Sequence, residues 1–144
     1  NETVQHAGQI AFTHKPAGWY HLPDEKLEVT HRGLRTNNKF KDREEVMGNT
    51  AALLMIKRET FYDTGGFVEK YTECFEDVQL NMECLIKGYK NIYLDCVRAH
   101  HHESVTRTKS QAAMQKLEQD YFNNLLPFWK RIPMDKKELI LSFK

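Results

Sequence analysis

The amino-acid sequence predicts an α/β fold in which short strands alternate with helices. Strand-like stretches occur at residues 4–12, 50–58 and 90–95, and glycines close two short helical patterns that lie between the second and third of them. Alternation of this kind is typical of a sheet layered with helices. Because about three strands are few for a complete α/β domain, we expect the chain to form part of a larger one.

The first half of the chain contains two apolar stretches separated by a long polar one. The stretch at 4–12, "VQHAGQIAF", has strand character, and no helical or strand period persists from Thr13 to Gly48. Loops of that length in compact domains are usually functional or disordered, so a long loop is expected at 13–48. The nearly continuous apolar run "TAALLMIKR" at 50–58 is typical of a strand buried on both faces, although a short helix also fits it.

The second half is dominated by helical patterns. "RETFYDTGG" predicts a short helix closed by Gly65 or Gly66. Residues 76–88 form the clearest helix, closed by Gly88, and a short strand, "KNIYLD", follows it. The apolar residues on one face of that helix recur at helical spacing and are Val78, Met82, Leu85 and Tyr89.

A further helix is predicted from about residue 109 to 130 and a last one at 134–142. Pro127 lies late in the longer pattern and should end or kink it, because proline lacks the backbone N–H of a helical residue. The apolar residues in line along this helix are Met114, Leu117, Tyr121 and Leu125. We therefore divide the chain into an α/β part at 1–104 and a helical tail at 105–144.

Composition narrows the class of protein. The 144 residues are 40% hydrophobic with a formal net charge of +1, which gives no electrostatic reason to expect nucleic acid or a membrane surface as partner. No apolar run approaches the roughly 20 residues that span a bilayer. The scattered cysteines, Cys74, Cys84 and Cys96, favour free buried thiols in a reducing compartment. We expect a cytoplasmic protein.

Two polar clusters could carry chemistry. Glu76 and Asp77 lie in the first turn of the predicted helix, where acids are favoured by the helix dipole. A carboxylate held there at the mouth of a pocket could also accept a proton from a substrate hydroxyl. In "HHHES", an extended chain would point His100 and His102 to one side and His101 to the other, as metal ligands or as exposed imidazoles of a polar turn.

These segments, in their order and spacing, resemble the second half of family 2 glycosyltransferases. The family's G-G-F-D-E, E-D-x-D-L, G-Y and H-H-E-S motifs match "GGFVE", "EDVQL", "GY" and "HHES" here. "VQHAG" resembles the strand before the acceptor loop, and "DYFNNLLPFW" resembles the trailing helix. Two positions depart from the family pattern: Val68 and Gln79 each replace an acid, so the resemblance assigns no role to these two positions.

The resemblance implies the C-terminal, acceptor-side portion of a GT-A fold, with a mixed sheet and trailing helices. It implies an inverting enzyme of polysaccharide biosynthesis that transfers a sugar from a nucleotide-sugar donor to a glycan or lipid-linked acceptor. Asp77 matches the general base, with Glu76 beside it, and His101, with His102, matches a position that helps to hold the metal or diphosphate. Gly65 and Gly66 belong to a motif on the substrate side.

The implied cofactor is a divalent cation, Mg²⁺ or Mn²⁺, bound mainly by a D-x-D motif that is absent from this chain. Trp19, Tyr20 and His21 in the long loop are candidates for stacking on a sugar ring, or they anchor the loop itself. Because the family's first half is missing, we expect this chain to be inactive alone. A truncated sheet exposes a strand edge that can pair with a second copy of the chain, which would give a homo-oligomer. A lipid-linked acceptor is compatible with peripheral association of the protein with the inner face of the membrane. The alternative function is a non-catalytic module that binds glycan, a partner protein or metal.

Overall fold

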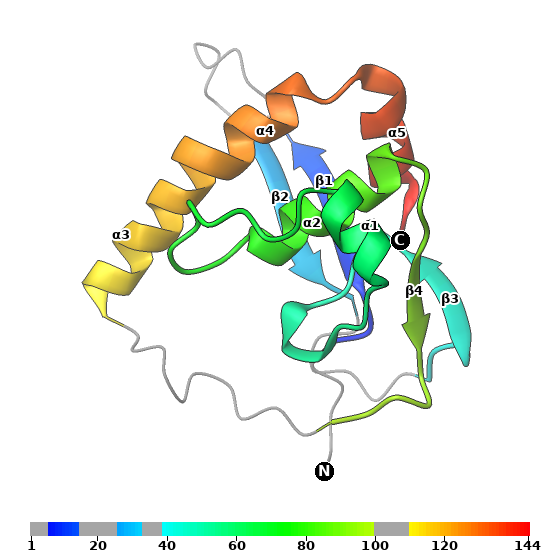
Figure 1. Ribbon diagram of the computed structural model, residues 1–144. Helices are drawn as coiled ribbons and strands as arrows, with labels where there is room; N and C mark the ends of the chain where they lie inside the picture. Colours follow the sequence, from blue (N-terminus) through cyan, green and yellow to red (C-terminus); the bar gives the residue numbers. More distant parts are fainter. Residues whose placement is uncertain (1–5, 15–25, 33–38, 100–109) are drawn as a thin grey trace.

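The computed structural model describes residues 6–14, 26–32, 39–99 and 110–144, and these ranges form a mixed α/β structure (Figure 1). The α/β class predicted from the sequence is confirmed. In chain order the elements are β1 (Gln9–His14), β2 (Lys26–His31), β3 (Arg43–Val46), the 3₁₀ turn η1 (Ala51–Leu53), α1 (Arg58–Asp63), α2 (Glu76–Ile86), β4 (Asn91–Leu94), α3 (Gln111–Asp120), the π-helical turn η2 (Tyr121–Leu125), α4 (Leu126–Arg131) and α5 (Met134–Ser142).

The strands form two antiparallel pairs, β1 with β2 and β3 with β4. A single antiparallel bridge between Gln9 and Gly48 connects the start of β1 to the segment after β3. Both ladders are antiparallel, so the mixed sheet expected from the sequence is not seen among the described residues.

The expectation of a long loop at 13–48 is wrong in its described part, because β2 and β3 both lie within it. In β2 the side chain of Leu27 is buried, Val29 is half-buried and Glu28 between them is exposed, which is the alternation of a strand with one face on the core. Strand β3 is rich in charge and buries only Val46, so its pairing with β4 could not be seen in its hydrophobic pattern.

The apolar run 50–58 is not a buried strand. It contains η1, and Met55 is 96% exposed and Leu53 48% exposed. The N–H groups of Thr50 and Ala51 are bound by side chains of other segments, so they are not available to a neighbouring strand. Thr50 caps the turn instead, accepting a hydrogen bond from the Ala52 N–H, which agrees with the short-helix alternative.

Helix α2 carries the central apolar face, as predicted. Val78, Met82 and Leu85 are buried, whereas Tyr89 lies beyond the helix end and is 38% exposed. Gly88, with a φ of +85°, follows the last turn, and the Tyr89 N–H bonds back to the Cys84 carbonyl. Glycine adopts this left-handed conformation without the penalty that a Cβ would bring.

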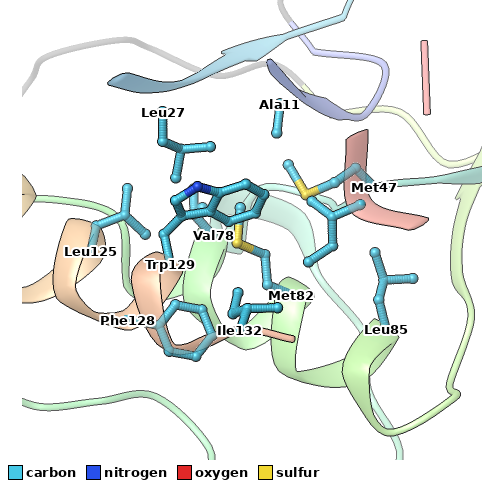
Figure 2. Packing of buried hydrophobic residues seen from close by; sticks show 11 residues of the cluster. Ala11, Leu27, Met47, Val78, Met82, Leu85, Leu125, Phe128, Trp129 and Ile132 are labelled. Atoms are coloured by element: carbon cyan, nitrogen blue, oxygen red, sulfur yellow. The ribbon is translucent and has the colours of Figure 1, made fainter. Parts of the chain in front are cut away.

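The core forms where α2, α4 and α5 meet one face of the β1–β2 hairpin. In Figure 2 the indole ring of Trp129 lies among side chains from β1, β2 and α2. The buried cluster consists of Ala11, Leu27, Met47, Val78, Met82, Leu85, Leu125, Phe128, Trp129, Ile132 and Ile140. Helices from the predicted tail therefore share one core with the predicted α/β part.

Only the second half of the long C-terminal helical pattern is buried. Met114 and Leu117 of α3 are 68% and 40% exposed, so the predicted buried line along this helix is wrong at its start. Between α3 and α4 the helix widens into η2, in which the Leu126 N–H bonds to the Tyr121 carbonyl five residues earlier. Pro127 follows at once, and the wider turn accommodates the ring that would clash with the carbonyl four residues before it in an α-helix.

The three cysteines are free, but only Cys84 is fully buried, and Cys96 is exposed. The expectation of buried thiols therefore holds for Cys84 and is wrong for Cys96. Within the described ranges, no helix has the length and apolar character needed to cross a bilayer.

Candidate functional site

The acid pair Glu76 and Asp77 opens α2, where the sequence predicted it. The residue before the pair, Phe75, has a φ of +78° and a ψ of −3°, a left-handed conformation that is rare and costly for a residue with a Cβ. The chain therefore makes a strained turn immediately before the two carboxylates. Non-glycine residues in this conformation persist only where the surrounding structure holds them.

The carboxylate of Asp77 does not cap its own helix. Its Oδ2 accepts a hydrogen bond from the N–H of Ala51 at 3.0 Å, and the start of α2 has no side-chain cap. No described residue donates to Oδ1, and within the described ranges no lysine or arginine forms an ion pair with Asp77. One oxygen of a half-buried carboxylate is thus fixed, while the other is not engaged by these residues.

A buried amide network lies one helical turn behind Asp77. The side-chain amide of Asn81 donates to the backbone carbonyl of Asp77 at 2.8 Å, to that of Asn49 at 2.7 Å and to Oε1 of Gln9 at 3.1 Å. Asn81 and Gln9 are each 2% exposed. Because buried polar groups must be satisfied, this network joins α2, β1 and the segment before η1 in one arrangement.

Gly48 allows these segments to come so close. A Cβ at this position would lie 2.5 Å from Oε1 of Gln9 and 2.6 Å from Cβ and Cγ of Asn81. No larger residue fits without moving the amide network, so the glycine sets how close η1 comes to α2.

His6 holds the neighbouring backbone amide. Its Nε2 accepts a hydrogen bond from the N–H of Thr50 at 3.0 Å, next to the Ala51 N–H that Asp77 binds. Burial, followed by electrostatic interaction with His31 and Arg32, lowers the pKa of His6 to about 4. The imidazole is therefore neutral at physiological pH, which is the form that can accept this hydrogen bond.

The other predicted site residues fall into two groups. Gly65 and Gly66 have φ values of +84° and +66° and close α1, where the Gly66 N–H bonds to the Phe61 carbonyl. This confirms their predicted role in ending the helix, whereas their substrate-side role stays a prediction. Five predicted residues lie outside the described part of the chain: Trp19, Tyr20, His21, His101 and His102.

Gln79 stands where the family 2 motif has an acid, and in this structure its side chain is buried and hydrogen-bonded. Gln79 is 7% exposed, and its Oε1 accepts a hydrogen bond from the Tyr71 hydroxyl at 2.7 Å. The side chain thus faces the loop that precedes α2. Burial, followed by the negative charge of Asp120, raises the pKa of Tyr71 well above its usual range, so its hydroxyl stays protonated as the donor.

No group of three or more histidine, cysteine, aspartate or glutamate side chains placed to hold a metal ion occurs in the described ranges. These residues do not by themselves form a centre for the divalent cation that the resemblance implies. Its ligands stay a prediction, with His101 and His102 outside the described ranges. A surface hollow lies elsewhere and is lined by Gln115, Glu118, Gln119, Phe122 and Asn123.

Four residues of this region were missed from the sequence: His6, Gln9, Asn81 and Asp120. The spacing of Asp77 and Asn81 was a usable signal, because residues four apart on a helix lie on one face and the two polar side chains are therefore expected side by side. Gln9 and Asp120 gave no such signal, since their partners lie far away in the chain.

Comparison with known proteins finds two long relatives. An uncharacterised protein of Sinorhizobium fredii, y4gI, is 34% identical over 125 residues, which cover 82% of this chain and 13% of the relative. The O-antigen biosynthesis protein RfbC of Myxococcus xanthus is 28% identical over 107 residues, 73% of this chain and 8% of that protein. The chain therefore spans less than a seventh of the length of either relative. No protein-family model matches it, and no solved structure matches significantly.

Proposed function

We propose that this chain is the acceptor-side part of a glycosyltransferase of polysaccharide biosynthesis, with Asp77 as the general base. The observation that carries the proposal is the geometry of the Asp77 carboxylate, which is fixed through Oδ2 by the Ala51 N–H at the start of a helix. The family 2 motifs support the reaction class. Similarity to a protein named for O-antigen biosynthesis supports a role with polysaccharides.

In the proposed reaction an acceptor hydroxyl attacks the anomeric carbon of the donor sugar. A new C–O bond forms as the bond to the nucleoside diphosphate breaks, and Asp77 accepts the hydroxyl proton. A carboxylate at a helix start is favoured in its ionised form by the helix dipole, which suits a base. The divalent cation would offset charge on the departing diphosphate.

The Ala51 hydrogen bond gives the base a defined direction. With Oδ2 bound, rotation of the carboxylate is restricted, so Oδ1 is the oxygen offered to the acceptor. Fixing a catalytic group in this way lowers the entropic cost of reaching the reactive geometry. The buried Asn81 amide fixes the backbone of Asp77 from behind, through its carbonyl.

The test is Asp77→Asn in the full-length protein, measured as nucleoside diphosphate release from a panel of nucleotide sugars with a glycan acceptor. Asparagine keeps the size and can accept the Ala51 hydrogen bond through its amide oxygen, but it cannot take up a proton at neutral pH. Turnover should fall by at least about 10²-fold, the lower end of general base catalysis, while donor affinity by calorimetry is unchanged.

Glu76→Gln is the matched control, because it alters the neighbouring acid of the same helix turn. Its turnover should fall much less than that of the Asp77 variant. If Asp77→Asn keeps wild-type turnover while folded, Asp77 is only a tie between α2 and η1 and not the general base. If the wild-type protein itself shows no turnover with any donor, the non-catalytic module becomes the better description.

A further inference from the structure

Asp120 is a buried carboxylate whose charge is met by backbone amides. It ends α3 and is 2% exposed. It accepts hydrogen bonds from the N–H groups of Thr72 at 3.0 Å, Glu73 at 2.7 Å and Cys74 at 3.2 Å, and from the Thr72 hydroxyl at 3.2 Å. Burial alone would raise the pKa of Asp120, but these donors outweigh it and hold the pKa below its usual range.

The loop that Asp120 binds leads directly into the acid pair. Cys74 is followed by the left-handed Phe75, and α2 begins at the next residue. The ring of Phe75 packs edge-on against Tyr121, with 6.2 Å between ring centroids. The Tyr121 hydroxyl in turn donates to the Leu27 carbonyl of β2 at 2.9 Å. Two consecutive residues, Asp120 and Tyr121, therefore hold consecutive parts of this turn and connect it to the sheet.

The two residues lie at the junction between α3 and η2. Asp120 is the last residue of α3 and Tyr121 is the first residue of η2, whose wider turn carries a bond from the Leu126 N–H to the Tyr121 carbonyl. Wide turns of this kind occur frequently at functional sites. Within the described ranges, Asp120 forms no ion pair with a lysine, arginine or histidine, and its side-chain hydrogen bonds are all with Thr72–Cys74.

We propose that Asp120 and Tyr121 are positioning residues for the acid pair. They hold the turn from Thr72 to Phe75 so that α2 starts with the carboxylate of Asp77 directed at the Ala51 N–H. The role of this positioning in catalysis rests on the proposed function. The positioning itself is a property of the folded chain and can be tested without an activity assay.

The first test is Asp120→Asn in the 144-residue chain, followed by amide hydrogen exchange. The NH₂ group of the asparagine cannot accept the hydrogen bonds that a carboxylate oxygen now accepts from the backbone N–H groups of Thr72–Cys74. We expect exchange at Thr72–Cys74 and at Ala51 to accelerate by at least about tenfold, because a buried donor is left unpaired. The amide of Ala51 is the decisive readout, because it bonds to Asp77 and not to Asp120.

Thr72→Val is the matched control. It removes one hydroxyl from the same cluster and keeps all three backbone donors, so exchange at Ala51 should stay within about twofold of wild type. The pairing of Val29 with Ala11 in the β1–β2 ladder provides the internal reference. Acceleration confined to Thr72–Cys74, or equal acceleration at Ala51 and in this ladder, would show that Asp120 only stabilises its own loop and would overturn the proposal.

If Asp120→Asn fails to fold, amide exchange of the Tyr121→Leu variant tests the proposal in its place. This substitution removes the ring that packs on Phe75 and keeps the carboxylate, and the proposal requires faster exchange at Ala51 in this variant too. In the full-length enzyme, kcat of the folded variants should fall at least about tenfold with an unchanged donor KM, as expected for misplacing a catalytic group. An inactive wild-type protein would refute the proposed function, while the exchange experiment would still decide the positioning.

Discussion

Acidification should weaken this fold through His6 over a defined pH range. The folded protein holds His6 with a pKa of about 4, against 6.5 for the free side chain. Below pH 6.5 the unfolded chain therefore binds a proton that the folded chain does not, and the unfolded state is favoured. The stabilisation is fully present above pH 6.5 and is lost as the pH falls toward 4.

The size of the effect follows from the two pKa values. Each pKa unit corresponds to about 1.4 kcal/mol, so the complete loss is about 3 kcal/mol, with about 2 kcal/mol already lost at pH 5. The contacts give the physical reason. A protonated imidazole cannot accept the Thr50 hydrogen bond, and its charge would lie near His31 and Arg32.

The assay is urea unfolding of the 144-residue chain, followed by tryptophan fluorescence, at pH 7.5, 6 and 5. His6→Gln is the comparison, because glutamine can accept the same hydrogen bond but does not titrate. Carboxylates such as Glu44 titrate in both proteins and cancel in the difference. The stability of wild type relative to the variant should fall by about 2 kcal/mol between pH 7.5 and 5. Parallel profiles of the two proteins would refute the reasoning.

Four further substitutions test the packing around the site, in the core and on the surface. Gly48→Ala should destabilise the chain by about 1–3 kcal/mol in urea unfolding, because its Cβ would overlap the buried amide pair. Gly65→Ala, with no heavy atom within 4 Å of its Cβ, should cost only the left-handed backbone penalty of about 1–2 kcal/mol. Trp129→Ala should cost about 3–5 kcal/mol, since the indole is 3% exposed. Met55→Ala, at a residue 96% exposed, should change the free energy of unfolding by less than about 0.5 kcal/mol, and a larger loss there would show that the run at 50–58 is covered in solution.

The parts of the fold predicted correctly are those determined by local pattern. Helix α2 has its apolar residues at helical spacing and a glycine just after its end, and both signals are local in the sequence. The run at 50–58 was misjudged because hydrophobic residues are buried only where another element covers them. Strand β2 was missed because it lies in a mostly polar stretch of sequence. Its pairing with β1, which makes it a strand, cannot be read from that stretch.

The same distinction applies to the candidate site. The acid pair was found because Glu76 and Asp77 are adjacent and stand at a helix start. Two of its supporting groups, His6 and Gln9, could not be found, because they reach this region through folding and not through neighbouring positions in the sequence. Asn81 lies four residues from Asp77 on the same helix, so its spacing was a signal that could have been used. The binding partner of Asp77, a backbone N–H, has no signature in the sequence at all.

The bond between Asn81 and Gln9 joins residues 72 positions apart, and the contact between Asp120 and Glu73 spans 47. Closing a loop of the larger size costs about 4 kcal/mol of chain entropy, which a single buried hydrogen bond does not repay. Both contacts therefore require the core to have assembled first, and we expect them to form late in folding. The orientation of the Asp77 carboxylate is then a property of the assembled chain, and a peptide that contains only α2 and the acid pair would lack the Ala51 N–H that directs it.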